Sequence, residues 1–69
     1  MIHYLVTCIQ SNSEVHVNTI NDVEFYRFVK VTNVSFRHTS VEITIKKGSG
    51  ELIHFPIALL VSIEPTDQE

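Results

Sequence analysis

The stretch "TINDVEFYRFVK" (Thr19–Lys30) decides the fold class, because its aromatic and β-branched residues are typical of a strand whereas its charges are spaced as on a helix. On a helix, Glu24, Arg27 and Lys30 share one narrow stripe, and the aromatic side chains gather on the opposite side. On a strand, the two phenylalanines would point to opposite faces, and one of them would share its face with Arg27. The periodicity therefore predicts a helix over residues 22–31.

The start of this predicted helix carries its own signals. Asn21 can act as the N-cap, and Glu24 stands three residues later, as in a capping box. Ile20 can pack on Phe25 across the first turn as a hydrophobic staple. We expect the helix to end near the β-branched residue Val31.

The segment before this stretch is predicted to be a hairpin. Residues 2–9 and 14–20 flank the polar sequence "QSNS", which has the composition of a turn. Closing the chain there places Cys8 opposite Val15 and gives the hairpin one largely apolar face. That face is expected to pack against the helix.

Two more hairpins are predicted after the helix. The first turns through "RHT" and pairs Phe36 with Val41. The second turns through "GSG", whose glycines can adopt the positive φ angles of a short loop. A three-residue loop at that point pairs Ile45 with Ile53.

The C-terminal part is predicted to contain one more strand. Pro56 has no backbone N–H, so the strand that carries it should end there or have a free edge there. The sequence "IALL" that follows indicates an irregular or helical turn. "VSIE" indicates a short last strand that stops at Pro65.

The predicted order is β-β-α-β-β-β, an α+β two-layer domain in which one helix (residues 22–31) covers a mainly antiparallel sheet. Residues 1–64 form the single globular domain, and residues 65–69 form a short acidic tail. The alternative is a small all-β barrel, of the SH3-like or another kind, in which residues 22–31 are extended.

The composition narrows the class of protein. One cysteine among 69 residues cannot form an internal disulfide, so a reducing compartment is favoured and the cytoplasm is the expected location. The chain start lacks a basic leader, and no apolar run approaches the roughly 20 residues of a membrane helix. A net charge of −3 is the wrong sign for a protein held to phosphates by basic side chains, so nucleic acid is the less favoured partner.

The sequence contains no pattern typical of catalysis or metal binding. His3, His16, His38 and His54 include no closely spaced pair, so no metal site is predicted. Cys8 alternates with the apolar residues of its predicted strand, where a thiol is buried and inert. We therefore expect a non-enzymatic protein without a cofactor.

One face of the predicted sheet is left uncovered and carries more apolar residues than a solvated face needs. We expect this face, or an open edge of the sheet, to bind a protein, either a second copy of the chain or a different protein. Such a module would act as an adaptor, inhibitor or subunit, like small accessory proteins of phages, other viruses or mobile elements. Leu5→Glu is expected to weaken this association without unfolding the chain. The predicted binding residues are Leu5, Thr7, Ile9, His16, Asn18, Leu52 and His54.

The alternative function is nucleic-acid binding through the tips of the two later hairpins. Arg37 and His38 lie at one tip, and Lys46 and Lys47 lie at the other. Because the tips are at opposite ends of one strand, these residues are not expected to form a single basic patch. Protein binding is the preferred hypothesis.

Overall fold

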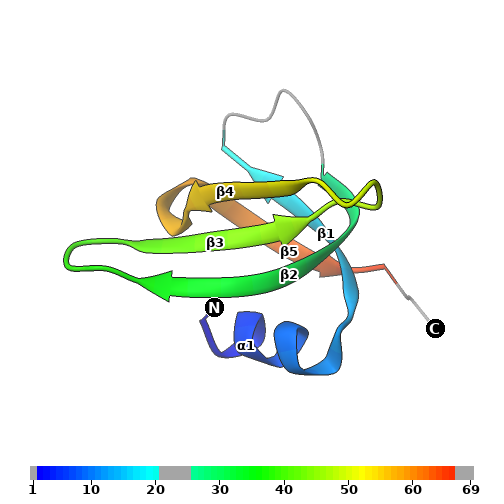
Figure 1. Ribbon diagram of the computed structural model, residues 1–69, viewed down its shortest axis with the longest axis horizontal. Helices are drawn as coiled ribbons and strands as arrows, with labels where there is room; N and C mark the ends of the chain where they lie inside the picture. Colours follow the sequence, from blue (N-terminus) through cyan, green and yellow to red (C-terminus); the bar gives the residue numbers. More distant parts are fainter. Residues whose placement is uncertain (1, 21–25, 67–69) are drawn as a thin grey trace.

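The fold is a five-stranded antiparallel sheet with one α-helix packed beside it, as the computed structural model of residues 2–20 and 26–66 shows (Figure 1). The strands lie in the order β4-β3-β2-β1-β5. The α+β class with one helix on an antiparallel sheet is therefore confirmed. The elements in chain order are α1 (Ile2–Ser11), β1 (Glu14–Thr19), β2 (Tyr26–Phe36), β3 (Val41–Lys46), β4 (Leu52–Pro56), the 3-10 helix η1 (Ile57–Leu59) and β5 (Leu60–Pro65).

The position of the helix differs from the prediction. The helix occupies Ile2–Ser11, where a strand was predicted, so the predicted first hairpin does not form. Tyr26–Val31 belongs to β2, so the prediction of a helix is wrong for these residues. Residues 21–25, with the predicted capping signals, lie outside the described residues. The order of elements is helix first and then five strands, in place of β-β-α-β-β-β.

The N-terminal segment is helical because its core contacts follow the helical repeat. Leu5 and Cys8, three residues apart, are buried, and Ile9 packs against the same core cluster. The segment is apolar at most positions, so an alternating strand pattern fits it as well. Packing against the sheet decides between the two, since α1 lies alongside β2 (Figure 1).

The sequence "QSNS" ends the helix and does not turn a hairpin. Asn12 has a φ of 56°, in the left-handed region, and its N–H donates to the carbonyl of Ile9 at 3.2 Å. The N–H of Ser13 donates to the carbonyl of Cys8, also at 3.2 Å. This pair of hydrogen bonds is the Schellman arrangement, which satisfies carbonyls that a helix end leaves free.

A β-bulge explains why residues 26–31 form a strand without strict alternation. Val15 pairs with Val29 and Val17 pairs with Tyr26, so β2 uses one more residue than β1 between these two pairs. Phe28 lies in this irregular step. The bulge lets Val29 reach the core while Phe28 stays exposed, which the strand pattern in the sequence does not show.

The later hairpins form in the predicted registers. The "GSG" loop has three residues, and Gly50 has a φ of 97°. η1 supplies the predicted helical turn, β4 ends at Pro56 as expected, and β5 is the predicted last strand. The confirmed pairs are Phe36 with Val41 and Ile45 with Ile53, and the same registers pair Val34 with Ile43 and Ile43 with Phe55.

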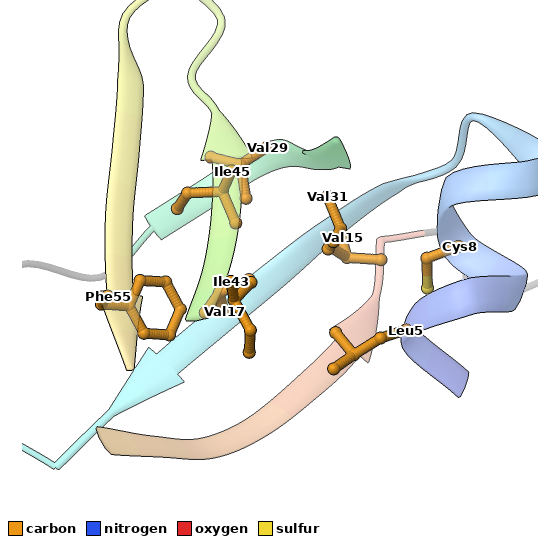
Figure 2. Close-up of a cluster of buried hydrophobic side chains, with 9 residues drawn as sticks. All are labelled: Leu5, Cys8, Val15, Val17, Val29, Val31, Ile43, Ile45 and Phe55. Carbon is orange, nitrogen blue, oxygen red and sulfur yellow. The ribbon is translucent and has the colours of Figure 1, made fainter. Parts of the chain in front are cut away.

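The core lies inside the curve of the sheet, with α1 beside it (Figure 2). Side chains from strands that do not neighbour each other meet there: Val17 of β1 and Ile43 of β3 belong to one cluster, which also contains Phe55 of β4. The rings of Tyr26 and Phe55 stack across the interior with centroids 6.5 Å apart. Leu5, fully buried, brings α1 into the same cluster, so helix and sheet share a single core.

The C-terminal end of the described chain is attached to the sheet. Pro65, the first residue of the predicted tail, is the last residue of β5. Thr66 Oγ1 donates a hydrogen bond to the carbonyl of Glu14 at 3.3 Å. Within the described residues, no helix has the length and apolar character needed to cross a membrane.

Candidate functional site

Three of the predicted protein-binding residues lie on α1 and do not belong to a sheet face. Leu5 has no exposed surface and is a core residue, so its assignment to a binding surface is wrong. Ile9 is partly buried and packs on the core, so it does not lie on a free sheet face either. Thr7 is exposed, but its Oγ1 donates to the carbonyl of His3 at 3.0 Å within the helix.

The other four predicted residues do point away from the core, on the outer face of the sheet. His16 and Asn18 alternate with the buried valines of β1, and Leu52 and His54 alternate with core residues of β4. The two strands are separated by β2 and β3. Three strand spacings of roughly 4.8 Å therefore separate the two pairs, which do not form one compact patch.

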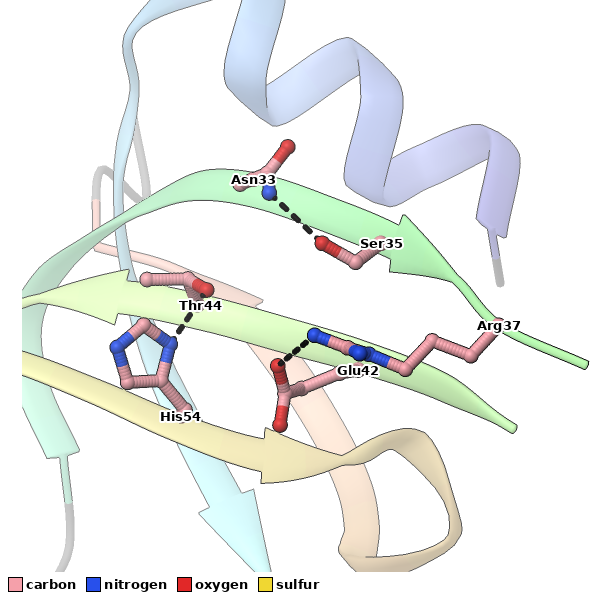
Figure 3. Close-up of polar contacts among 6 residues, drawn as sticks. All are labelled: Asn33, Ser35, Arg37, Glu42, Thr44 and His54. Carbon is pink, nitrogen blue, oxygen red and sulfur yellow. Dashed lines mark hydrogen bonds and ion pairs between the residues drawn. The ribbon is translucent and has the colours of Figure 1, made fainter. Parts of the chain in front are cut away.

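Most of these outer-face side chains have a partner within the domain. Asn18 Nδ2 donates to the hydroxyl of Ser62 at 2.9 Å, which links β1 to β5. His54 Nδ1 shares a 2.9 Å hydrogen bond with Thr44 Oγ1, the one buried polar side chain among the described residues (Figure 3). These contacts stabilise the sheet, so their side chains are less available to a partner.

The two outer strands leave hydrogen-bonding edges open. Among the described strands, β4 pairs only with β3, and β5 pairs only with β1. Large apolar side chains lie exposed on both of these strands: Leu52 on β4 is 52% exposed, and Val61 on β5 is 55% exposed. An open edge with exposed apolar residues is the usual template for pairing with another chain.

The residues of the nucleic-acid alternative are divided between two separate hollows. Arg37 and His38 line a hollow of about 430 Å³ with η1, and the Arg37 guanidinium lies 3.9 Å from Glu42 (Figure 3). Lys46 and Lys47 line a second hollow, of about 250 Å³. The expectation that the two hairpin tips do not form one patch agrees with this placement.

The second hollow contains residues that the sequence analysis did not assign to a site. Besides Lys46 and Lys47, it is lined by Glu14, Phe28, Lys30 and Gly48. Phe28 is 56% exposed, although it was predicted to lie on the buried side of a helix. The lysines lie close together because β1, β2 and β3 pair with one another. The sequence analysis placed Lys30 on a helix, so this proximity was not predicted.

The described part of the chain also contains histidines, a thiol and a tyrosine hydroxyl whose surroundings bear on their chemistry. No group of three His, Cys, Asp or Glu side chains in residues 2–20 and 26–66 could hold a metal ion. Cys8 is a buried free thiol, as its core assignment predicted, although it lies on a helix. Burial, and then the adjacent Cys8, raise the pKa of the Tyr4 hydroxyl above 10.0.

No family model matches the chain, no curated protein sequence matches it significantly, and no solved structure does so either. The surfaces described above are therefore the basis for inferring a function.

Proposed function

We propose that the protein is a small protein-binding module that adds an extended segment of another chain to the free edge of β4. The observation that carries this proposal is the unpaired edge of β4 beside the exposed side chain of Leu52. Main-chain hydrogen bonds would provide affinity, and contacts with alternate side chains would provide selectivity. The partner is either a second copy of the chain or a different protein.

The hairpin geometry identifies which backbone groups face outward. The N–H of Lys47 donates to the carbonyl of Glu51 at 2.8 Å, and the register runs without interruption from there to Pro56. Hydrogen-bonded and non-hydrogen-bonded pairs alternate in an antiparallel ladder, so the N–H groups of Leu52 and His54 point away from β3. Pro56, which has no N–H, occupies the next outward position.

The outward edge has little protection against pairing. Native edges are commonly blocked by lysines, bulges or prolines within the strand. β4 contains no lysine, its pairing with β3 has no bulge, and its one proline is the last residue. An adaptor, inhibitor or subunit could use such an edge, and the single cysteine suits action in the cytoplasm.

The first test uses a second copy of the chain as the probe. Sedimentation velocity over a dilution series at neutral pH would detect self-association. Leu52→Pro removes an outward N–H at the first position of a strand, where proline is tolerated. Leu52→Ala is the matched control, since it shortens the side chain and keeps the N–H.

A monomeric wild type would be tested against a displayed library of extended peptides. Edge pairing predicts that bound peptide slows amide hydrogen exchange at Leu52 and His54 more than at Ile53 and Phe55, whose N–H groups point toward β3. Leu52→Pro is expected to abolish binding, and Leu52→Ala to weaken it. Binding that survives Leu52→Pro, or the absence of both self-association and peptide binding, would overturn the proposal.

A further inference from the structure

We propose that the hollow beside Phe28 binds a nucleotide unit, with the phosphate held by lysine side chains and the base stacked on the Phe28 ring. This site uses side chains on the outer face of the sheet, whereas the proposed protein binding uses outward backbone groups of β4; the two adjoin where Lys46 pairs with Leu52. It rests on different chemical groups from the proposed protein binding.

The hollow gathers all three lysines of the chain, Lys30, Lys46 and Lys47, in a protein whose net charge is −3. Lys30 on β2 lies directly opposite Lys46 on β3, so both side chains point to the same side of the sheet. Lys47 follows at the start of the hairpin loop. Sheet pairing thus brings together two positive charges, on Lys30 and Lys46, that are 16 residues apart in the sequence.

The lysines are only partly neutralised by the carboxylates nearby. Lys47 Nζ lies 3.4 Å from a carboxylate oxygen of Glu51. Within residues 2–20 and 26–66, neither Lys30 nor Lys46 forms an ion pair, although Glu14 also lines the hollow. Like charges directly opposite each other on neighbouring strands destabilise a sheet, and a bound phosphate would relieve that repulsion.

Phe28 supplies an aromatic surface beside these charges. Its φ is 56°, a left-handed conformation that bulky residues rarely adopt, and more than half of its surface is exposed. Glycine or asparagine would adopt this φ without strain. Phenylalanine strains the backbone there, and its half-exposed ring is not buried enough to offset that strain fully. Backbone strain of this kind is often found at binding sites.

The combination of an exposed ring with ammonium groups identifies the chemistry of the ligand. Single-stranded nucleic acids and free nucleotides present a flat base next to a phosphate, and proteins bind them with aromatic rings and basic side chains. A volume of about 250 Å³ gives room for one such unit. A double helix keeps its bases stacked inside, so it could not place a base on Phe28.

The test is a titration of isotopically labelled protein followed by the chemical shifts of its backbone amides. The probes are AMP, an oligothymidylate of about ten nucleotides, inorganic phosphate and a phosphotyrosine peptide. We expect saturable shifts centred on Phe28, Lys30 and Lys46 with AMP or with the oligonucleotide. The ratio of those two affinities tells whether the unit is bound free or as part of a strand.

Two variants separate the base contact from the phosphate contact. Phe28→Asn suits the left-handed backbone and should weaken binding by about fivefold to a hundredfold, the usual range for losing one stacked base. Lys46→Gln should reduce the slope of log affinity for the oligonucleotide against log salt by about 0.7. Arg37→Gln in the other hollow is the matched control and should change neither quantity.

Several results would overturn this site. They are the absence of binding to both AMP and the oligonucleotide, inorganic phosphate binding as tightly as AMP, tighter binding of the phosphotyrosine peptide, or unchanged affinity in Phe28→Asn. Lys30→Gln changes a residue of the hollow on β2, which β3 separates from β4, so it should weaken nucleotide binding and leave protein association unaffected. Failure of the nucleotide site and failure of the β4 edge are therefore distinguishable.

Discussion

The backbone N–H of Phe28 donates a hydrogen bond to Nδ1 of His16 at 3.4 Å, and the two rings lie at 85° with centroids 4.9 Å apart. His16 lies on β1, and Phe28 lies where β2 bulges away from that strand. The imidazole therefore satisfies a backbone N–H next to the irregular pairing and contacts the exposed ring. This contact helps to hold Phe28 in its left-handed conformation.

Replacing Phe28 with glycine should leave the free energy of unfolding unchanged or raise it. The positive φ costs about 1–3 kcal/mol with a bulky side chain and is relaxed with glycine, which offsets the loss of a half-exposed ring. Urea denaturation would measure the change. Phe36 is the control, since it is an exposed phenylalanine of the same strand without a positive φ. Equal destabilisation by Phe28→Gly and Phe36→Gly would contradict the strain at Phe28.

Leu5→Glu should unfold the protein, which reverses the expectation from the sequence. Leu5 is fully buried against the sheet, and a carboxylate there would be charged in an apolar core or would have to take up a proton. We expect a loss of at least about 3 kcal/mol, a large part of the stability of so small a domain. Circular dichroism during thermal unfolding would detect it. Val6→Glu, at the adjacent and partly exposed position, should retain the fold; equal stability of the two variants would show that α1 does not pack as described.

The second half of the fold was predicted better than the first because the turn sequences in the second half are compatible with only one kind of structure. The glycine loop between β3 and β4 requires positive φ, and Pro56 limits where its strand can continue. In contrast, Asn12 accepts a left-handed conformation both in hairpin turns and at helix ends. The apolar segment before it fits both repeats, so only packing on β2 decides that it is a helix.

The hollow beside Phe28 could not be predicted because of the same wrong assignment. Treating residues 22–31 as a helix placed Phe28 in the core and Lys30 on a solvated stripe, far from Lys46. The bulge at Phe28 and the pairing of Lys30 with Lys46 depend on tertiary contacts that a short-range pattern does not record. By contrast, the outward positions of Leu52 and His54 followed from the correct hairpin register.

Asn12→Gly should stabilise the protein, and Asn12→Val should destabilise it. Asn12 occupies the left-handed position of the Schellman arrangement, where glycine has no Cβ penalty and a β-branched residue is strongly disfavoured. We expect a gain of up to about 1 kcal/mol for glycine and a loss of at least that size for valine. Chemical denaturation of both variants would measure these changes. Gln10, an exposed helical residue, is the control: Gln10→Gly should destabilise, so a gain there would refute the explanation.

The stability of the protein should fall at alkaline pH through Tyr4. Burial, and then the charge and hydrogen bond of Cys8, raise the pKa of the Tyr4 hydroxyl above its ordinary value of 10.0. The unfolded chain therefore loses this proton at lower pH than the folded chain. The contribution of Tyr4 to the free energy of unfolding is fully present below about pH 10 and is lost as the pH rises through the pKa of the folded state. Urea denaturation across that range should show a decline that is smaller in Tyr4→Phe. The phenolate absorbance of a Tyr26→Phe variant would report Tyr4 alone, and titration at or below the ordinary pKa would contradict the combined effect of partial burial and Cys8 on this hydroxyl.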